Sequence, residues 1–176
     1  MVDIREDLRF ICAEVTSALR YAESKHGAFM AFNGVAIFGA VGTLRSLTSD
    51  SADPYMAMLL SLTMILLTCA MLTSMSSFLP QFIEHTKKNI VPAKDNILFF
   101  EHIKLHTVDS YIENLRMNYG VDPAEITQLD RCLILQIIVN AQLSARKFRL
   151  FRWAAYFDLA AIVVVLCGFL LRAILL

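Results

Sequence analysis

The sequence lacks charged residues over one long stretch and has no net charge overall. The run from Pro54 to Ile83 contains no Asp, Glu, Lys, Arg or His. A helix of a soluble protein rarely continues so far without a charge, because its outer face must meet water, so the run excludes an ordinary soluble core helix. Lys and Arg total 16, and Asp and Glu also total 16. Nucleic-acid binding is therefore not expected, since it requires a surplus of cations to neutralise phosphates.

Cysteines are few and widely separated. Four are present, none of them in a CxxC pair: Cys12, Cys69, Cys132 and Cys167. The second and the fourth lie in apolar runs, where a thiol behaves as a small hydrophobic side chain. Neither a disulfide framework nor a zinc site is predicted from them. Residues 1–25 carry charges of both signs, so no cleavable signal peptide is expected.

Catalytic motifs are also missing. The sequence has no Gly-rich phosphate loop, nucleophile elbow or carboxylate pair at a meaningful spacing, so we predict no catalytic residue, metal or cofactor and do not expect an enzyme. His102 and His106 are predicted to share a helix face, a spacing that can bind zinc. Their order, EHIKLH, lacks the HExxH arrangement that places a general base beside the metal. A metal-dependent membrane hydrolase built on them, with Glu84 and His85 nearby, is one alternative.

What the sequence does contain is mainly apolar. Hydrophobic residues make up 57% of the chain and the mean hydropathy is +0.56, which places it among integral membrane proteins. About 20 apolar residues cross a bilayer core as a helix. Three segments approach or exceed that length: residues 27–44, 54–83 and 153–171. The predicted fold is an all-α integral membrane protein, with three transmembrane helices and a cytoplasmic helical domain inserted between the second and third.

The positive charges predict the orientation. Lys and Arg concentrate in residues 1–27 and 84–152, whereas the loop between the first two spans holds only Arg45 and the C-terminal end only Arg172. The positive-inside rule therefore places the N-terminus in the cytoplasm. The predicted parts are an amphipathic cytoplasmic helix at 1–26, a transmembrane hairpin at 27–83, a cytoplasmic helical domain at 84–152 and a third transmembrane helix at 153–176.

Local patterns predict where helices form near the N-terminus. An apolar stripe at a three-and-four spacing predicts a helix over residues 2–26, and it consists of Ile4, Leu8, Ile11, Val15, Leu19 and Ala22. Such a stripe either packs on a partner helix or lies on the membrane surface, and the mixture of acids and bases on the polar face favours packing. Residues 45–53 are polar and are expected to form a short connection. Pro92 and Asp95 are predicted to open a helix that contains NILFFEHI.

Further signals follow in the second half of the chain. A turn near Thr107 is predicted to precede a helix that ends at Tyr119–Gly120. Asp122 and Pro123 are typical of a helix start. Because no proline follows, the sequence predicts one long helix from Ala124 into the third span.

Polar residues inside the spans are functional candidates. Asn33 lies within the first span and Asp158 within the third. Each either belongs to a pore or relay or pairs with a neighbouring helix. The expected partner of Asp158 in the second case is Asn33 or an interfacial arginine. Small residues that share one face allow close helix approach, and they are Ala36, Gly39 and Ala40. The hydroxyls of Thr68, Thr73, Ser74, Ser76 and Ser77 either bond their own backbone carbonyls or line a water path.

Two groups of residues before the third span suit an anion. A basic cluster consists of Arg146, Lys147, Arg149 and Arg152. Such a cluster either anchors a helix against anionic lipid or binds phosphate. Gln136, Asn140 and Lys147 are predicted to face one side of the long helix, as a site for a base edge and a phosphate requires. The same residues also suit a surface that faces water.

Three segments carry a resemblance to a known family. They are YAESKHGAFMAFNG at 21–34, NILFFEHI at 96–103 and LILQIIVNAQLSARKFRLFRWA at 133–154. In this order they resemble the transmembrane effectors of Pycsar antiphage systems over nearly the whole chain. The resemblance marks Glu23, Lys25, Asn33, Asn96, Phe100, His102, Gln136, Asn140 and Lys147. Glu101 departs from the family pattern, in which a glycine is expected.

The resemblance implies an antiviral role. The family is implied to sense a cyclic pyrimidine mononucleotide, cUMP or cCMP, made by a paired nucleotide cyclase that need not touch the effector. It is then implied to impair the bacterial inner membrane, so that the infected cell stops growing or dies. We expect ligand contacts from Asn96, Phe100, His102, Gln136, Asn140, Lys147 and Arg149. We expect gating or assembly contacts from Asn33, Asp158, Ala36, Gly39 and Ala40.

A multi-pass homo-oligomer in contact with membrane lipids is expected. The alternatives from other classes stay open. One is a structural or partner-docking membrane protein, and another is the same effector gated by a cyclic oligonucleotide.

Overall fold

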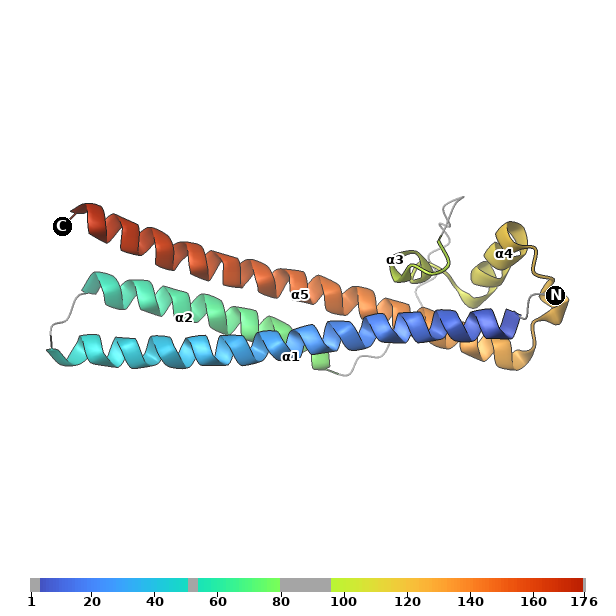
Figure 1. Cartoon of the computed structure of the whole chain (residues 1–176), viewed down its shortest axis with the longest axis horizontal. Coiled ribbons are helices and arrows are strands. Elements are labelled where there is room, and N and C mark those ends of the chain that lie inside the picture. Colours follow the sequence, from blue (N-terminus) through green and yellow to red (C-terminus); the bar gives the residue numbers. More distant parts are fainter. Residues whose placement is uncertain (1–3, 51–53, 80–95, 176) are drawn as a thin grey trace. The chain divides into compact units, whose positions relative to one another are not determined.

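A computed structural model of the chain describes residues 4–50, 54–79 and 96–175. Every regular element within them is a helix, and they form no strand, so the predicted all-α fold is confirmed. Figure 1 labels the elements: α1 (Ile4–Asp50), α2 (Pro54–Met75), η1 (Ser76–Phe78), α3 (Phe100–Ile103), α4 (Val108–Tyr119), η2 (Pro123–Glu125) and α5 (Gln128–Leu175), where η denotes a 3-10 helix.

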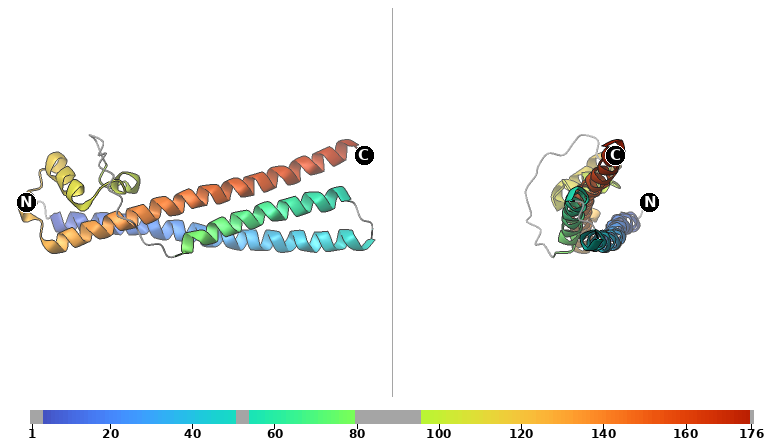
Figure 2. Two further views of the ribbon diagram at one scale, coloured as in Figure 1. Left: turned by 180° about the vertical axis from the view of Figure 1, so that it is seen from behind. Right: turned by 90° about the vertical axis from the view of Figure 1, so that its left-hand side faces the viewer.

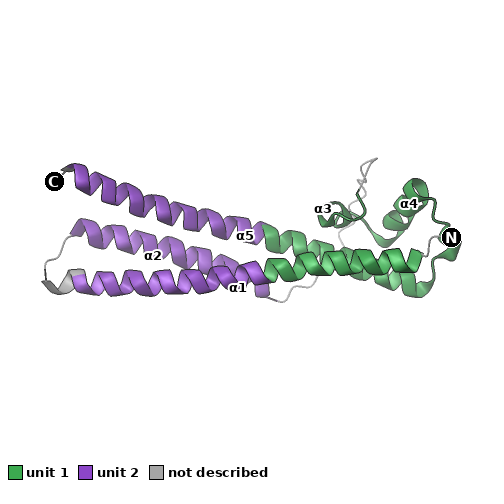
Figure 3. Cartoon of the chain, viewed as in Figure 1, with its two compact units in different colours: residues 1–23, 80–148 green, residues 24–79, 149–176 purple. Residues whose placement is uncertain are grey.

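The chain divides into two compact units, which Figure 3 distinguishes by colour. The head unit comprises residues 1–23 and 80–148, and the membrane unit comprises residues 24–79 and 149–176. Among the described residues, three helical segments are long and apolar enough to cross a membrane, and they are Ile4–Ser46, Pro54–Phe78 and Gln128–Ile174. These segments indicate a membrane protein, while the cytoplasmic placement of the head unit stays a prediction.

The first helix is longer than its predicted parts. α1 has 47 residues, so the segments 1–26 and 27–44 belong to one continuous helix. Residues 45–50 are helical, and the prediction of a polar connection is wrong for them. Neither Gly nor Pro interrupts them, and the Ser46 hydroxyl donates to the Thr43 carbonyl at 2.8 Å, which satisfies this polar group within the helix.

Two predictions fall partly outside the described residues. The second span was predicted to continue to Ile83, but α2 ends at Met75 and is followed by η1, which ends at Phe78. The predicted helix start at Pro92 and Asp95 lies wholly outside the residues that the structure describes.

The helix predicted around NILFFEHI is wrong for residues 96–99. Only one helical turn, α3, forms there. The Leu98 N–H donates to the Asn96 side-chain oxygen at 2.9 Å, and the Asn96 N–H donates to His102 Nδ1 at 3.1 Å. An Asn side chain that bonds nearby backbone offers the chain an alternative to helix, which explains the late start.

Both predicted ends of α4 are confirmed. The Ser110 N–H donates to Thr107 Oγ1 at 3.2 Å and the Thr107 N–H donates to Ser110 Oγ at 2.8 Å, which caps the start. Gly120 ends the helix with φ 69°, a left-handed conformation that glycine adopts readily. Tyr111 is fully buried, which raises its pKa, and its hydroxyl donates to the Ile97 carbonyl at 3.3 Å.

The long helix begins later than predicted. Asp122 and Pro123 open only η2, and Ile126 after it is extended and buried. Thr127 caps α5 instead. Its N–H and hydroxyl donate to Asp130 Oδ2 at 2.9 and 2.6 Å, and the Asp130 N–H donates back to Thr127 Oγ1 at 3.4 Å.

Replacing Asp130 with Ala is expected to destabilise the start of α5 by about 1 kcal/mol at neutral pH. Hydrogen bonds from the hydroxyl and then the N–H of Thr127, with the charge of Arg5, lower the pKa of Asp130. Because the folded pKa is lowered, the stabilisation is complete above the unfolded pKa of about 3.9 and is lost as pH falls below it. Amide hydrogen exchange of residues 128–138 measures the difference between D130A and the unchanged chain. A pH-independent difference would contradict the prediction, and Glu125→Gln is the control.

The head unit has one apolar core, built on α1, α3, α4 and α5. Its buried members are Leu8, Ile11, Val15, Ile103, Tyr111, Ile112, Leu115, Ile126, Ile134, Ile137, Ile138 and Ala141. The members on α1 recur every three or four residues, which confirms that the predicted stripe of residues 2–26 packs inward. Leu19 of that stripe is only partly buried.

The membrane unit is a bundle of three helices. Figures 1 and 2 show α1, α2 and α5 side by side there, with α2 running opposite to the other two. The outer surface is apolar, as the large exposures of Phe38 (80%) and Val35 (74%) illustrate. Helices α2 and α5 approach closely at Gly168, where an added Cβ would lie 2.3 Å from Leu59 Cδ1.

Candidate functional site

Most residues predicted to contact the ligand lie in the head unit. Those in the head unit are Asn96, Phe100, His102, Gln136, Asn140 and Lys147, whereas Arg149 is exposed in the membrane unit. Within the head unit they fall into three groups: an ion pair, a line of polar side chains between two helices, and an aromatic stack that leads to residues 96–102.

The ion pair joins α1 to α5. Lys147 Nζ lies 2.8 Å from Glu23 Oε1, and the exposed fractions of the two side chains are 12% and 44%. The cation is therefore mostly removed from water, while the carboxylate keeps much of its hydration. An ammonium in this setting binds an anion more strongly than it would in open water, because the local dielectric is lower.

A line of polar side chains follows the same helix pair. Gln136 Nε2 donates to Asn140 Oδ1 at 3.0 Å, and Asn140 Nδ2 donates to Thr16 Oγ1 on α1 at 3.1 Å. Ser144, one turn further along α5, is fully buried, and its hydroxyl has no hydrogen-bond partner among the described residues. A buried hydroxyl without a partner is unfavourable, so it is available to a polar ligand atom.

An aromatic stack includes the residue that follows Lys147 on α5. The Phe148 ring stacks on Phe100 with centroids 5.3 Å apart and planes 22° apart, and it contacts Tyr21 at 6.4 Å. Phe99 adjoins Phe100 at 5.2 Å. Phe148 follows Lys147 directly on α5, so a ring that could stack on a base and a cation that could hold a phosphate belong to the same helical turn.

Residues 96–102 form a compact turn beside the stack. The Asn96 N–H donates to His102 Nδ1, and the Asn96 side-chain oxygen accepts from the Leu98 N–H. The His102 ring lies edge-on to Phe99 at 5.4 Å. Asn96 and His102 are therefore brought together as predicted contact residues, but each already has bonds within the turn.

His102 and His106 do not share a helix face, so that prediction is wrong. α3 ends at Ile103, and His106 precedes the cap of the next helix. No group of three His, Cys, Asp or Glu side chains within the described residues could hold a metal ion. Glu84 and His85, the other proposed ligands, lie outside those residues.

Glu101, which departs from the family pattern, forms an ion pair with Lys104 on the same turn. Its charge is balanced locally by that ammonium. The Lys104 carbonyl also accepts a hydrogen bond from Gln142 Nε2 at 3.4 Å, which ties this turn to α5.

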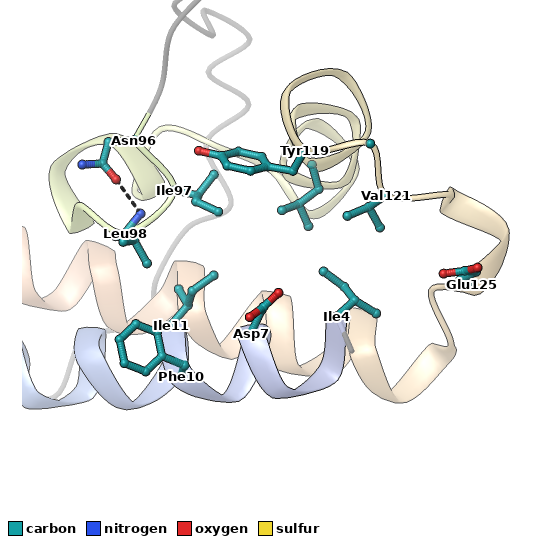
Figure 4. A pocket seen from close by; sticks show the side chains of 12 residues that line it. Ile4, Asp7, Phe10, Ile11, Asn96, Ile97, Leu98, Tyr119, Val121 and Glu125 are labelled. Atoms are coloured by element: carbon teal, nitrogen blue, oxygen red, sulfur yellow. Dashed lines mark hydrogen bonds between the residues drawn. The ribbon is translucent and has the colours of Figure 1, made fainter. Parts of the chain in front are cut away.

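A pocket of about 690 Å³ in the head unit shares Asn96 with the predicted contact residues (Figure 4). Twelve residues line it: Ile4, Asp7, Phe10, Ile11, Asn96, Ile97, Leu98, Leu115, Tyr119, Gly120, Val121 and Glu125. In Figure 4 the Asp7 carboxylate lies between Ile4 and Ile11 and faces Tyr119. Asp7 and Glu125 give the lining negative charge, and no Lys, Arg or His is among the described residues that line it. The pocket therefore does not match an anionic nucleotide.

The polar candidates of the membrane unit pair with each other. With the Asn33 amide oriented so that its nitrogen faces Asp158, it donates to the two carboxylate oxygens at 2.9 and 3.3 Å. Both residues are buried. Of the small residues, Gly39 is exposed, while Ala36 and Ala40 are half-buried. The interhelical partner proposed for Asn33 is thus observed.

Some hydroxyls of the second span take the first of the two predicted roles. Thr68 and Thr73 donate to carbonyls four residues earlier, both at 2.7 Å, which confirms bonding to their own helix. Ser74 and Ser77 are buried instead, and Ser77 Oγ has no hydrogen-bond partner among the described residues.

Comparison with known families decides the identity. A model of the Pycsar effector protein domain matches residues 7–174. The chain belongs to the Pycsar effector family. The resemblance found in the sequence is confirmed, and membership implies an effector of antiphage defence. No curated protein and no solved structure matches the chain.

One residue of this Pycsar effector was missed by sequence reasoning. His26 is fully buried in the membrane unit, and its Nδ1 shares a hydrogen bond of 2.9 Å with Ser74 Oγ. Its ring lies edge-on to Phe151 at 5.5 Å and to Phe78 at 6.1 Å. The available signal was its position, seven residues before Asn33 and therefore on the same helix face.

Thr16, Ser144 and Phe148 of the effector's head unit were also missed. Each is a short or apolar side chain whose part in the site depends on its neighbour across the α1–α5 contact. Their spacing along a single helix does not distinguish them from ordinary packing residues.

Proposed function

We propose that this Pycsar effector binds a cyclic pyrimidine mononucleotide, cUMP or cCMP, through its head unit on the cytoplasmic side of the bacterial inner membrane. Binding then impairs the membrane, and the infected cell stops growing or dies. One observation carries the proposal: the largely buried Lys147 of α5 forms an ion pair with Glu23 of α1, and the next residue of α5, Phe148, stacks on Phe100.

Lys147 supplies the contact to the phosphate. A cyclic phosphate carries one negative charge and competes with Glu23 for the ammonium. Glu23 is 44% exposed, so it can return to water when it is displaced. A charge-assisted hydrogen bond of this kind contributes about 1.5–3 kcal/mol.

The aromatic stack supplies a surface for the base. Stacking of one aromatic pair contributes about 0.5–1.5 kcal/mol beyond the area it buries, and a pyrimidine ring on Phe100 gains a similar amount. The amides of Gln136 and Asn140 and the hydroxyl of Ser144 face the same helix pair and can read a base edge or a ribose hydroxyl. Asn96 and His102 approach from the neighbouring turn.

Helix α5 links sensing to the membrane. It is continuous from Gln128 to Leu175 and carries both Lys147 and Asp158. The nucleotide must bind the active arrangement more tightly than the resting one, or the equilibrium does not shift.

The surface of the membrane unit offers one face for self-association and one cluster for lipid contact. An added Cβ at Gly39 meets no atom within 4 Å, so this face is open to another copy of the chain, and Ala36 and Ala40 flank it. Arg149 and Arg152 are exposed before Trp153 and suit anionic lipid. A nucleotide cyclase supplies the messenger without having to contact the effector.

Calorimetry on the purified full chain tests the sensing step. We expect cUMP or cCMP to release binding heat and the linear UMP and CMP to release none. A cyclic dinucleotide is included, and its binding in place of the mononucleotides would favour the cyclic-oligonucleotide alternative. No heat from any cyclic nucleotide at about 100 μM, which corresponds to roughly 5.5 kcal/mol, would refute the sensing proposal.

Impairment of the membrane is tested in cells. Bacteria that express the effector are given each nucleotide, and membrane potential is followed with a voltage-sensitive dye. Loss of potential that requires both effector and nucleotide is expected.

The pocket favours a second candidate function, the docking of a partner. Its lining is mainly apolar, and the Asp7 and Glu125 carboxylates suit a basic protein segment. Substituting Asp7 with Lys is expected to abolish such docking, measured as binding of a basic peptide to the purified chain. Cyclic nucleotide binding, measured in parallel by calorimetry, should keep its dependence on Lys147, which does not line this pocket.

A further inference from the structure

The interior of the membrane unit contains polar side chains although its exterior is apolar. Six buried side chains have polar atoms: His26, Asn33, Thr63, Ser74, Ser77 and Asp158, each with at most 6% exposure. Polar and ionisable side chains are unfavourable inside a bilayer and usually mark ion or proton pathways when they face the interior of a helix bundle.

The polar groups follow one another along the bundle. His26 and Asn33 lie seven residues apart on α1, roughly 10 Å along the helix axis. His26 shares its hydrogen bond with Ser74 of α2, and Asn33 bonds Asp158 of α5. Ser74 lies level with His26, and Thr63 precedes Ser74 on α2, which runs antiparallel to α1. At roughly 1.5 Å per residue, Thr63 therefore lies about 6 Å beyond the level of Asn33.

We propose that the membrane unit conducts protons, with His26 and Asp158 as its two proton-exchanging groups. This inference rests on the proposed function and specifies what crosses the membrane. His26 accepts a proton on one ring nitrogen to become imidazolium and releases a proton toward Asp158. The Asp158 carboxylate becomes a carboxylic acid and passes its proton onward. Both groups return to their starting states, so one proton moves down its gradient per cycle and no other reactant is consumed.

The resting structure keeps this path closed. The rings of Phe151 and Phe78 pack edge-on against His26, and Lys25 Nζ lies 5.6 Å from the centroid of the Phe151 ring. The Asn33 amide donates hydrogen bonds to the Asp158 carboxylate, where it competes with any other donor. Opening therefore requires these rings to move and water or the Ser74 hydroxyl to bridge the gap between the two groups.

Protons fit these residues better than metal cations do. Metal-ion selectivity uses rings of several carbonyl or carboxylate oxygens. The described interior offers one carboxylate, one imidazole, one amide and three hydroxyls, of which the Thr63 hydroxyl already donates to the Leu59 carbonyl at 2.9 Å.

Reconstituted vesicles test the proposal. The full chain is placed in phosphatidylethanolamine and phosphatidylglycerol vesicles that contain a pH-sensitive dye, and a potassium gradient with valinomycin sets the potential. Proton uptake is recorded with cUMP, with cCMP and without nucleotide, while release of carboxyfluorescein is recorded in parallel. We expect nucleotide to accelerate proton uptake without dye release.

Substitutions then assign the residues. Asp158→Asn and His26→Gln are each expected to lower proton uptake on the order of a hundredfold, a typical contribution of a positioned proton-transfer group. Asp158→Glu is expected to keep part of the flux, which separates proton exchange from folding. Thr68→Ala, which removes an exposed hydroxyl, is the control, and circular dichroism and gel filtration check each variant.

The outcomes separate the two proposals. Release of the dye together with protons overturns the proton relay, and so does unchanged proton uptake in Asp158→Asn. Either result leaves nucleotide sensing intact if calorimetry still shows binding. Proton uptake that depends on Asp158 without any nucleotide binding upholds the relay and overturns the sensing proposal. No uptake under any condition overturns the relay.

Discussion

Substituting the two members of the Glu23–Lys147 ion pair is expected to change nucleotide affinity in opposite directions. Lys147→Met removes the cation that holds the phosphate and should weaken binding by about 10- to 100-fold, the equivalent of about 1.5–3 kcal/mol. Glu23→Gln removes the carboxylate that competes with the phosphate and should strengthen binding by roughly tenfold, about 1.4 kcal/mol. The two effects have opposite signs because the proposed phosphate replaces Glu23 as the partner of Lys147.

Calorimetry with cUMP and cCMP measures both affinities, and growth of expressing cells reports activation. The Glu23 variant should slow growth at lower nucleotide concentration than the unchanged chain. Arg131→Met is the matched control, since Arg131 pairs with Asp109 at 3.0 Å in the same unit but lies outside the proposed site. If both Lys147→Met and Glu23→Gln weaken binding equally, the pair has only a structural role.

Gly168→Leu is expected to disrupt the membrane unit, with a loss of about 1–3 kcal/mol in folding free energy. A Cβ at this position would lie 2.3 and 2.6 Å from the two terminal carbons of Leu59, so even alanine requires that side chain to turn away. Leucine adds a branched group for which α2 and α5 leave no room. The separation of the helices would also break the bond from the Tyr55 hydroxyl to the Gly168 carbonyl, which is 3.2 Å long.

Thermal unfolding in detergent and abundance in membranes measure the effect. Leu59→Ala in the same chain should restore part of the stability, because it removes the atoms that clash. Gly39→Leu is the control for helix propensity, since a Cβ there meets no atom within 4 Å. An equal loss from Gly39→Leu and Gly168→Leu would show that close packing at Gly168 is not the cause. Weakened self-association of the Gly39 variant alone would support assembly through that face.

Much of the fold follows from signals that are local in sequence. Charge-free runs identify the three apolar helices, because a helix in lipid needs only length and composition to be detected. Thr107 and Gly120 were located correctly because capping depends on residues within one turn. The predicted helix starts at 96–99 and at Ala124 were wrong because two local signals compete there. At 96–99 the Asn96 side chain bonds the backbone in place of a helical turn, and near Ala124 the cap at Thr127 replaces the predicted start at Asp122.

The candidate site was less predictable than the fold. Gln136, Asn140 and Lys147 were recognised by their spacing on one helix, but their partners Thr16 and Glu23 come from the opposite end of the chain. Pairing between distant segments leaves no periodic signal in a single sequence. The stacking of Phe148 on Phe100 and the burial of His26 are likewise products of tertiary contacts.

The bond between Asn33 and Asp158 has a consequence for biosynthesis. Ribosomes add roughly 5–20 residues per second, so Asn33 enters the bilayer on the order of ten seconds before Asp158 has been made. During that interval the amide of the nascent first span has no carboxylate to receive its hydrogen bond. Messages that are cut short before codon 158 should therefore yield fragments that quality-control proteases remove, which would keep incomplete copies of the effector from accumulating.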